Sequence, residues 1–382
     1  MILVVGGGIA GAAVALALHK AGIDVAVHEA HPESSGDEGA FLTLAENGMR
    51  ALRQIDAAGV VAQASAPLRA MRVCGGDGTE IAAAALGDGQ GPGYRYLTRA
   101  RLCMVLQREV RRRGIVLRRG ERLVAAGPEG RGVVASFANG IQTSADLLIG
   151  ADGVRSTVRG VLDPHGAAPR YVGQRVFYGY AVDTGVSGDP DCIHFVRGGA
   201  AFGYLVTERE GTWWFARVSD EELACDRIDA GTTVGWVAEL EALLRNEPVP
   251  LAIVRSARRV LVTNAYDLAG VRIWHRGRMV IIGDAAHAAS PATGQGASMA
   301  LEDAVVLAKA LRDMPDPESA FAVYERLRRD RVEANTAASA GMSASPTPAD
   351  ARSSARQSAD IEEQLDWNTP ATESGRGRRS AG

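Results

Sequence analysis

The stretch MILVVGGGIAGAAVALALHKAGIDVAVHEA, residues 1–30, joins two apolar runs through a glycine-rich turn and an Ala/Leu-rich segment. The apolar residues Ile2–Val5 predict a strand that is covered on both faces. Residues 12–21 predict a helix, and Gly22 precedes the second apolar run, which ends in Glu29. This order of strand, turn, helix and strand predicts a βαβ unit and places the chain in the α/β class.

The glycines of the turn have the spacing of a phosphate-binding motif. Gly6 permits a tight turn, Gly8 lets the backbone approach a pyrophosphate, and Gly11 lets the helix pack closely on the strand. The helix N-terminus adds free N–H groups and a partial positive charge. Glu29 follows where a carboxylate can accept hydrogen bonds from ribose hydroxyls. The opening segment therefore predicts a dinucleotide site.

The composition sets limits on function. The chain has 382 residues, 46% of them hydrophobic, and a formal net charge of −3. This length suffices for two domains, and the small charge gives no electrostatic footprint for nucleic acid. The four cysteines are widely spaced without a CxxC pair, which indicates no metal site. No stretch reaches the ~20 apolar residues of a membrane span, and the opening run lacks a signal peptide's basic start. We therefore expect a cytoplasmic monomer or homodimer without nucleic-acid or membrane partners.

A second loop follows a predicted buried strand over residues 146–150 and contains Asp152 and Gly153. Ser156 and Arg159 come shortly afterwards. An Asp-Gly pair is a common turn, so this loop alone leaves a structural and a functional interpretation open.

A third loop follows the apolar run over residues 278–282 and begins with Gly283 and Asp284. It continues through Pro291–Gly296 into a predicted helix over Ala297–Leu311. A loop between the carboxyl end of a strand and the start of a helix is where open α/β sheets bind ligands.

Between these loops, aromatic residues concentrate from Tyr171 to Tyr266. Strand-length runs there are separated by pairs rich in glycine and acidic residues, which predicts an antiparallel sheet with one face on a core or a ligand. Alternation groups the side chains into two faces but does not decide which face points inward.

The three motifs in this order resemble those of the FAD-dependent aromatic hydroxylases, the para-hydroxybenzoate hydroxylase-like class A flavoprotein monooxygenases. The resemblance runs from residue 1 to about residue 338. It implies an α/β fold: a Rossmann-like FAD-binding domain with an inserted antiparallel-sheet substrate domain and a C-terminal helical segment. The expected boundaries are 1–68, 97–170 and 268–340 for the FAD-binding domain, 69–96 and 171–267 for the substrate domain, and 341–382 for a partly flexible tail.

The resemblance also implies a set of cofactor contacts. They are Gly6, Gly8 and Gly11 at the pyrophosphate, Glu29 at the adenosine ribose, Arg99 at the phosphate–ribityl region, Asp152 and Gly153 for FAD and NAD(P)H, Asp284 at the ribityl chain, Pro291 beside the isoalloxazine ring, and Gly294 and Gly296 at the pyrimidine end of the flavin, with Gln295 and Ala297 as further cofactor-binding residues of the same loop. The chain departs from the family pattern at Ser298, where relatives usually carry Asn, and at Ala30, where they often carry Arg.

The implied reaction uses NAD(P)H and O2 to hydroxylate an aromatic, phenolic or polycyclic natural product through a C4a-hydroperoxyflavin. A phenol would need a general base near the flavin. The catalytic candidates are His194, Tyr204 and Pro291, with His287 as an alternative that more simply orders its own loop. Arg197 or Arg217 could orient an acidic substrate.

Other functions stay open at this stage. A FAD-binding cyclase on the same fold, or a module that holds flavin without a redox step, would share the motifs. A plain NAD-dependent dehydrogenase would explain the first motif alone. A flavin-dependent halogenase would need a lysine beside the flavin, and the lysines here, Lys20 and Lys309, lie in the first and a late predicted helix.

Overall fold

The computed structural model describes residues 1–32, 40–87, 89, 91–344 and 361–371. Its first sheet has six strands in the order β18-β19-β12-β1-β2-β8. From β19 to β8 each strand pairs in parallel with its neighbour, and β18 pairs with β19 antiparallel at the edge. The strands are β1 (Ile2–Val5), β2 (Val25–Glu29), β8 (Val116–Arg119), β12 (Leu147–Gly150), β18 (His275–Arg276) and β19 (Met279–Ile281).

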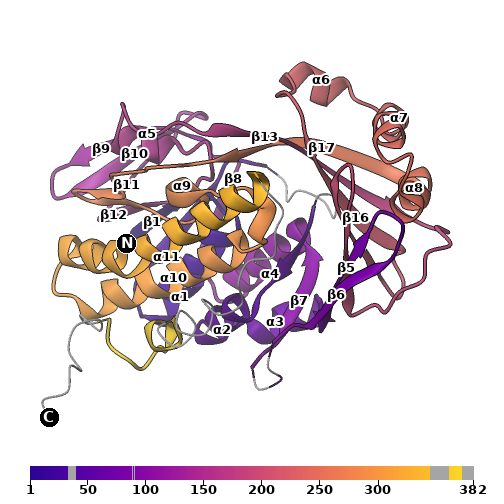
Figure 1. Cartoon of the computed structure of the whole chain (residues 1–382). Helices are drawn as coiled ribbons and strands as arrows, with labels where there is room; N and C mark the ends of the chain where they lie inside the picture. The colour runs from indigo at the N-terminus through magenta and orange to yellow at the C-terminus, as the bar shows by residue number, and fades with distance from the viewer. Residues whose placement is uncertain (33–39, 88, 90, 345–360, 372–382) are drawn as a thin grey trace, which may run out of the picture.

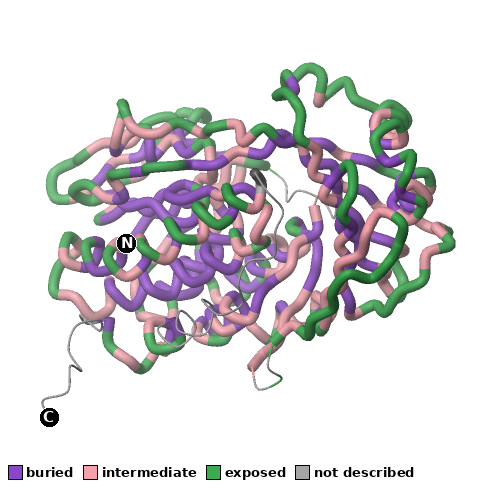
Figure 2. The backbone as a smooth tube through the Cα atoms, viewed as in Figure 1, coloured by how far each residue is buried: buried purple, intermediate pink, exposed green. Residues whose placement is uncertain are grey.

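The helices that pack on this sheet are built from small apolar residues. In α1 (Ile9–Lys20) every residue from Ile9 to Leu18 is buried, because α10 (Gly296–Asp313) and α4 (Arg99–Arg112) cover it. Ala-rich helices can approach one another closely, so α1 and α10 pack in direct contact. Figure 1 shows α10 and α11 (Pro317–Ala344) beside α1, and Figure 2 shows that buried residues concentrate there.

The second large sheet has seven strands in the order β17-β13-β16-β15-β14-β5-β6. The expected antiparallel sheet is present, with one exception: β5 pairs with β14 in parallel. This sheet lies on the opposite side of the molecule from α10 and α11 (Figure 1). Its strands are β5 (Ala70–Gly75), β6 (Glu80–Ala85), β13 (Arg170–Ala181), β14 (Cys192–Arg197), β15 (Ala201–Val206), β16 (Thr212–Ser219) and β17 (Ala257–Asp267).

Two small sheets and several short helices complete the described chain. The small sheets are β3 (Phe41–Leu44), β7 (Tyr94–Thr98) and β4 (Ala66–Leu68), and β11 (Gln142–Ala145), β10 (Gly132–Phe137) and β9 (Leu123–Glu129). The short helices are α2 (Glu46–Gln54), α3 (Ala58–Gln63), α5 (Thr157–Leu162), α6 (Cys225–Ala230), α7 (Thr233–Leu243), α8 (Pro248–Arg255), α9 (Asp284–His287) and the 3-10 turn η1 (Pro291–Thr293). Across the described residues, no helix combines the length and the apolar character needed to cross a membrane.

Residues 361–371 of the expected tail pack against the first sheet's helices. Ile361 and Leu365 are buried in the same core cluster as α1 and α10. The Lys309 ammonium of α10 donates hydrogen bonds to the carbonyl groups of Gln364 and Asp366 at 2.7 and 2.6 Å. The remaining tail, 345–360 and 372–382, lies outside the described residues. The α/β fold is confirmed, while the domain boundaries given above stay a prediction.

Candidate active site

The three motif loops meet at one edge of the six-stranded sheet. Since β1, β12 and β19 are neighbouring parallel strands, their carboxyl ends point the same way. The Ala151 N–H donates to the Val5 carbonyl at 2.8 Å, and the Ile282 N–H donates to the Gly150 carbonyl at 2.9 Å. Loops that lie far apart in the sequence are thereby joined into one surface, at the position where open α/β sheets bind ligands.

The first glycine loop has little room for side chains except at one position. A Cβ on Gly6, whose φ is +100°, would lie 2.4 Å from the Ala151 carbonyl oxygen. A Cβ on Gly11 would lie 1.8 Å from the Gly6 carbonyl oxygen, so helix and turn are in direct contact. At Gly8 a Cβ would meet no atom within 4 Å. The turn therefore needs glycine for packing at Gly6 and Gly11, whereas Gly8 faces open space that a phosphate group fits.

Glu29 ends β2 beside this turn. Its carboxylate accepts hydrogen bonds from the Gly7 N–H at 2.6 Å and from the His31 N–H at 2.8 Å. Gln107 of α4 fixes the other side of the turn by donating to the Gly7 carbonyl at 2.6 Å. The carboxylate is thus held against the glycine loop, where the ribose of a dinucleotide lies in such folds. Gln107 has no signal in the sequence, since only the packing of α4 brings it here.

Asp152 has a structural role that the sequence left open. Its carboxylate accepts hydrogen bonds from the Ser156 hydroxyl and from the Thr157 N–H at 2.7 Å, so it caps α5. Burial raises the pKa of Asp152, while these hydrogen bonds lower it. Arg159, buried on α5, donates to the Val154 carbonyl at 2.7 Å and to the Ala285 carbonyl at 3.0 Å. This arginine therefore ties the second loop to the third.

The third loop contains one exposed and one buried carboxylate. Asp284, the first residue of α9, is exposed, and no hydrogen-bond or ion-pair partner is found for its carboxylate among the described residues. Asp303, fully buried on α10, accepts hydrogen bonds from the Gly283 N–H at 2.9 Å and pairs with His287 Nε2 at 2.5 Å. The contacts of Asp303 with Gly283 and His287 hold the third loop on α10. The Asp284 carboxylate is not used in this contact and is available to a ligand.

Asp303 belongs to a buried ion network that sequence reasoning missed. Arg328 of α11 has no exposed surface and contacts Asp303 Oδ1 through Nε at 2.7 Å and Glu302 Oε2 through Nη1 at 2.6 Å. Arg331 completes the pairing of Glu302 at 2.8 Å. Burial by itself would raise the pKa of Asp303, but the interactions with His287 and with the Arg328 guanidinium lower it below its usual value. The network fixes α10, α11 and the third loop to one another.

The segment from Pro291 to Ala297 leads into α10. Pro291, Gly294 and Gly296 are exposed, and no described side chain caps the N-terminus of α10. The N–H groups at this helix start are therefore free to stabilise negative charge. A Cβ on Gly294 would lie 3.3 Å from Thr43 Oγ1, which places the loop next to β3.

The departure from the family pattern at Ser298 has a packing explanation. Ser298 is buried, and its hydroxyl accepts a hydrogen bond from the Ala45 N–H at 3.2 Å. A Cβ on Gly48 would lie 2.6 Å from Ser298 Oγ, so α2 and α10 are in direct contact here. A larger residue at position 298 would push α2 away.

Arg99 begins α4 and is exposed, with its backbone N–H bonded to the Ala40 carbonyl at 2.9 Å. The Arg99 guanidinium lowers the pKa values of Cys103 on α4 and of Tyr178 on β13, so it lies near both side chains. This position borders both the glycine loops and the aromatic sheet.

The strand register decides which sheet residues face the glycine loops. Trp213 packs on Phe41 and Tyr96, from β3 and β7, with ring centroids 6.0 and 5.8 Å apart. Phe215 shares this face because it lies two residues from Trp213 on the same strand, and its ring lies 5.9 Å from Phe41. We name the side of the sheet that contains Trp213 and Phe215 the inner face.

His194 and Tyr204 lie on the other face. They are register partners with stacked rings 4.7 Å apart, and Tyr204 belongs to the core cluster that α7 and α8 cover. Burial lowers the pKa of His194 and raises that of Tyr204 to about 12. This position does not favour the expected catalytic roles of His194 and Tyr204, because the sheet itself separates them from the inner face; the two roles stay a prediction. Pro291 stays a candidate within the third loop.

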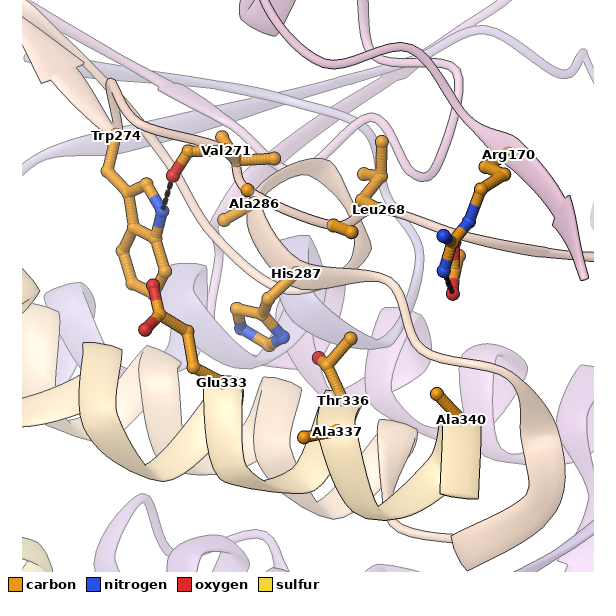
Figure 3. A pocket seen from close by; sticks show the side chains of 13 residues that line it. Arg170, Leu268, Val271, Trp274, Ala286, His287, Glu333, Thr336, Ala337 and Ala340 are labelled. Atoms are coloured by element: carbon orange, nitrogen blue, oxygen red, sulfur yellow. Dashed lines mark hydrogen bonds and ion pairs between the residues drawn. The ribbon is translucent and has the colours of Figure 1, made fainter. Parts of the chain in front are cut away.

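A cavity of about 240 Å³ lies behind the third loop, between residues 267–271 and α11 (Figure 3). Trp274 and His287 form part of its wall, and an Arg170–Asp267 ion pair at 2.7 Å lies at its edge. Of the residues expected to contact a dinucleotide, none lines it. It is thus separate from the surface formed by the three loops.

A parallel sheet with three glycine- and aspartate-bearing loops at its carboxyl edge, facing an antiparallel aromatic sheet, defines a dinucleotide-binding enzyme of the flavoprotein type. Residues 1–339 match a family described as FAD binding domain. The chain belongs to the FAD-dependent aromatic hydroxylases, as the resemblance of its motifs predicted, and FAD is its cofactor.

Named relatives agree with this assignment. The chain is 32% identical over 342 residues to aurachin C monooxygenase/isomerase of Stigmatella aurantiaca, covering 87% of this chain and 85% of that protein. It is 32% identical over 357 residues to 3-amino-4-hydroxybenzoate 2-monooxygenase PtnB3 of Streptomyces platensis, covering 87% and 84%. HpxO of Klebsiella pneumoniae, crystallised with FAD and uric acid, has the same fold, with a TM-score of 0.81, 23% identity and coverage of 95% and 93%.

Proposed function

We propose that this enzyme uses NAD(P)H and O2 to hydroxylate a planar aromatic substrate. In this reaction one oxygen atom of O2 enters the substrate, the other leaves as water, and NAD(P)H is oxidised to NAD(P)+. The observation that supports the proposal is the convergence of the three loops on a surface bordered by half-exposed aromatic residues of the inner face. We also propose the cytoplasm as its location, because NAD(P)H is supplied there.

The residues present fit FAD. The open space at Gly8 suits the pyrophosphate, Glu29 is held where a ribose is bound, and Asp284 is a carboxylate without a described partner. The uncapped start of α10 suits the end of a flavin that becomes negative on reduction. When bound, FAD supplies the chemistry of accepting a hydride and activating O2.

The chain's own residues have three tasks in this proposal. Gly153 and Asp152 shape the second loop, and Arg159 keeps it against the third, so that the cofactor surface is already formed. The aromatic inner face excludes water from the reacting side. The N–H groups of Gly296 and Ala297 stabilise negative charge at the start of α10 without moving.

The test measures NAD(P)H consumption by the purified FAD-loaded protein across a panel of aromatic acids, phenols and quinolones. Mass analysis of the products detects the added oxygen. We expect at least one compound to accelerate NAD(P)H oxidation and to gain one oxygen atom. The same slow rate with every compound would favour the alternative, a FAD-binding cyclase or another flavoprotein that does not hydroxylate.

A further inference from the structure

A segment late in the described chain, residues 361–371, binds across α1, α2 and α10, and we name it the clasp. Its side chains Ile361, Leu365 and Ala371 are at most 4% exposed and belong to the same hydrophobic cluster as α1 and α10. Figure 1 draws the clasp in yellow, near α2. Burial of three apolar side chains stabilises a docked position, so the clasp is part of the folded core.

The end of α10 holds the clasp by its backbone. Arg312 donates a hydrogen bond to the Trp367 carbonyl at 2.8 Å. The Asp313 carboxylate accepts one from the Ala371 N–H at 2.8 Å. The Trp367 ring also contacts two cations, because its centroid lies 5.2 Å from the Lys20 ammonium and 4.9 Å from the Arg312 guanidinium. Since Lys20 ends α1 and Asp313 ends α10, the clasp joins the C-terminal ends of these two helices.

The clasp also holds the C-terminal end of α2. Gln54, the last residue of α2, accepts a hydrogen bond from the Trp367 N–H through its side chain at 3.0 Å. Lys20 donates to the Gln54 carbonyl at 2.7 Å, which brings the ends of α1 and α2 together. Trp367 is therefore the residue of the clasp at which all three helices meet.

The other end of α2 contacts the cofactor loops. Asn47, in the first turn of α2, donates to Gln295 Oε1 at 3.3 Å and to Glu302 Oε1 at 2.6 Å. Gln295 immediately precedes Gly296, where α10 begins without a side-chain cap. Because a short α-helix is held rigid by its own backbone hydrogen bonds, a shift of α2 at Gln54 displaces Asn47 as well. The clasp is thus connected to the start of α10 through α2.

We infer that the clasp is a positioning element for FAD: by holding α2 against α10, it keeps Gln295 and the start of α10 in the arrangement that binds the flavin. The inference goes beyond the proposed hydroxylation, because it concerns the affinity for FAD whichever reaction follows. It rests on the proposed position of the flavin at the start of α10. Coupling between two binding events is reciprocal. A docked clasp that tightens FAD binding by a given factor is itself docked more firmly, by the same factor, once FAD is bound.

The first test removes the contact at which the three helices meet. Trp367→Ala in the full chain should raise the dissociation constant for FAD by about 5–50-fold, within the usual range for coupling between two sites. Titration of the apoprotein with FAD, followed by the flavin fluorescence, measures this constant. Trp367→Phe keeps an aromatic ring beside the two cations and should lose less affinity. Asn368→Ala changes the next residue, which is exposed, and should bind FAD like the wild type.

The second test uses the wild-type protein and separates coupling from a merely structural contact. Hydrogen exchange of the Trp367 and Ala371 amides is measured without and with saturating FAD, since both amides donate hydrogen bonds to helices that the clasp contacts. We expect FAD to slow this exchange by about the factor that Trp367→Ala removes from the FAD affinity. The control is the exchange of α7, which packs on the aromatic sheet and reports opening of the whole chain.

Normal FAD binding by Trp367→Ala overturns the inference. So does clasp exchange that FAD slows no more than it slows the exchange of α7, because the clasp would then be a structural contact without coupling to the cofactor. If Trp367→Ala does not fold, the exchange measurement on the wild type decides alone. These measurements use neither substrate nor NAD(P)H, so a failure of the proposed hydroxylation leaves their outcome unaffected.

Discussion

Arg328 is fully buried and Arg217 is half-buried, and their surroundings differ. Arg328 has no exposed surface and contacts two carboxylates, Glu302 and Asp303, at 2.6 and 2.7 Å. Arg217 has a buried Nη1 atom and lies two residues from Phe215 on the same face of β16, with no described anion. The first lies beneath the cofactor loops and the second on the inner face of the aromatic sheet.

The difference separates a charge that is held by partner carboxylates from a charge that has no described partner. A buried ion pair with all its partners present fixes geometry, because breaking it would strand a charge in the interior. A buried charge without a partner is destabilising by itself and tolerable where a ligand completes it. The network at Arg328 positions the third loop, whereas no described carboxylate fixes the Arg217 side chain.

The largest effect should come from Arg328→Met. This change leaves Glu302 and Asp303 buried with fewer partners, so the free energy of unfolding should fall by about 3–5 kcal/mol. Urea unfolding of the FAD-loaded protein measures it. Arg331→Met is the matched control: it also removes a partner of Glu302, but its side chain is 20% exposed, so the loss should be smaller. Equal losses would show that burial does not distinguish the two arginines.

A cofactor effect of intermediate size is expected at Asp284. Because this carboxylate is exposed and has no described partner, Asp284→Ala should leave the stability of the apoprotein unchanged. The affinity for FAD should fall by about 10–100-fold, the range of a charge-assisted hydrogen bond. Fluorescence titration of the apoprotein with FAD measures this. Asp229→Ala, at an exposed aspartate of α6, is the control and should bind FAD normally. Normal FAD binding by Asp284→Ala would contradict the assignment of the third loop to the FAD site.

A small effect on the rate of NAD(P)H oxidation is expected for a substitution at His194, because His194 lies on the face of the sheet opposite the inner face. His194→Phe keeps a ring to stack on Tyr204 and removes a buried Nε2 for which the described residues offer no hydrogen-bond partner. The rate and pH profile of substrate-stimulated NAD(P)H oxidation should therefore stay close to those of the wild type. A loss of about 100-fold or more, as expected for a general base, would return His194 to the active site despite its position.

The smallest effect is expected at an ion pair near the surface. The hydrogen bonds from Arg112 are the largest influence on the pKa of Glu109; burial opposes them, and the hydrogen bond from Arg113 lowers the pKa further, so that it falls from 4.5 to about 2. Since the pKa is lower in the folded state, this pairing stabilises the protein above pH 4.5 and is lost as the pH falls from 4.5 to about 2. Solvent screens the exposed Arg112, so Glu109→Gln should cost about 1 kcal/mol or less at pH 7. Urea midpoints measured from pH 7 to pH 3 should fall less steeply for Glu109→Gln than for the wild type. An equally steep fall would contradict the assignment.

Local sequence determined the framework of the cofactor side. The alternation of apolar runs and glycine turns is enough to predict β1, α1 and β2, because a buried parallel strand and a tight turn each restrict the residue types allowed. The loops with Asp152 and Asp284 follow from the same reasoning, since the carboxyl ends of parallel strands share one edge. The family resemblance then named the cofactor, and the comparison with known proteins confirmed it.

Tertiary structure alone decided the substrate side and the supports of the loops. The two-residue alternation along strands sorts the side chains into two sets, one with Tyr178 and Phe215 and one with His194 and Tyr204. Only the packing of Phe41 and of α7 shows which set faces the cofactor loops. Arg328 lies in a charged stretch that looks solvated in the sequence, and α10 buries it. The physical reason is the same in each case: burial and pairing depend on neighbours distant in the chain, whereas turns and strands depend on the residues within them.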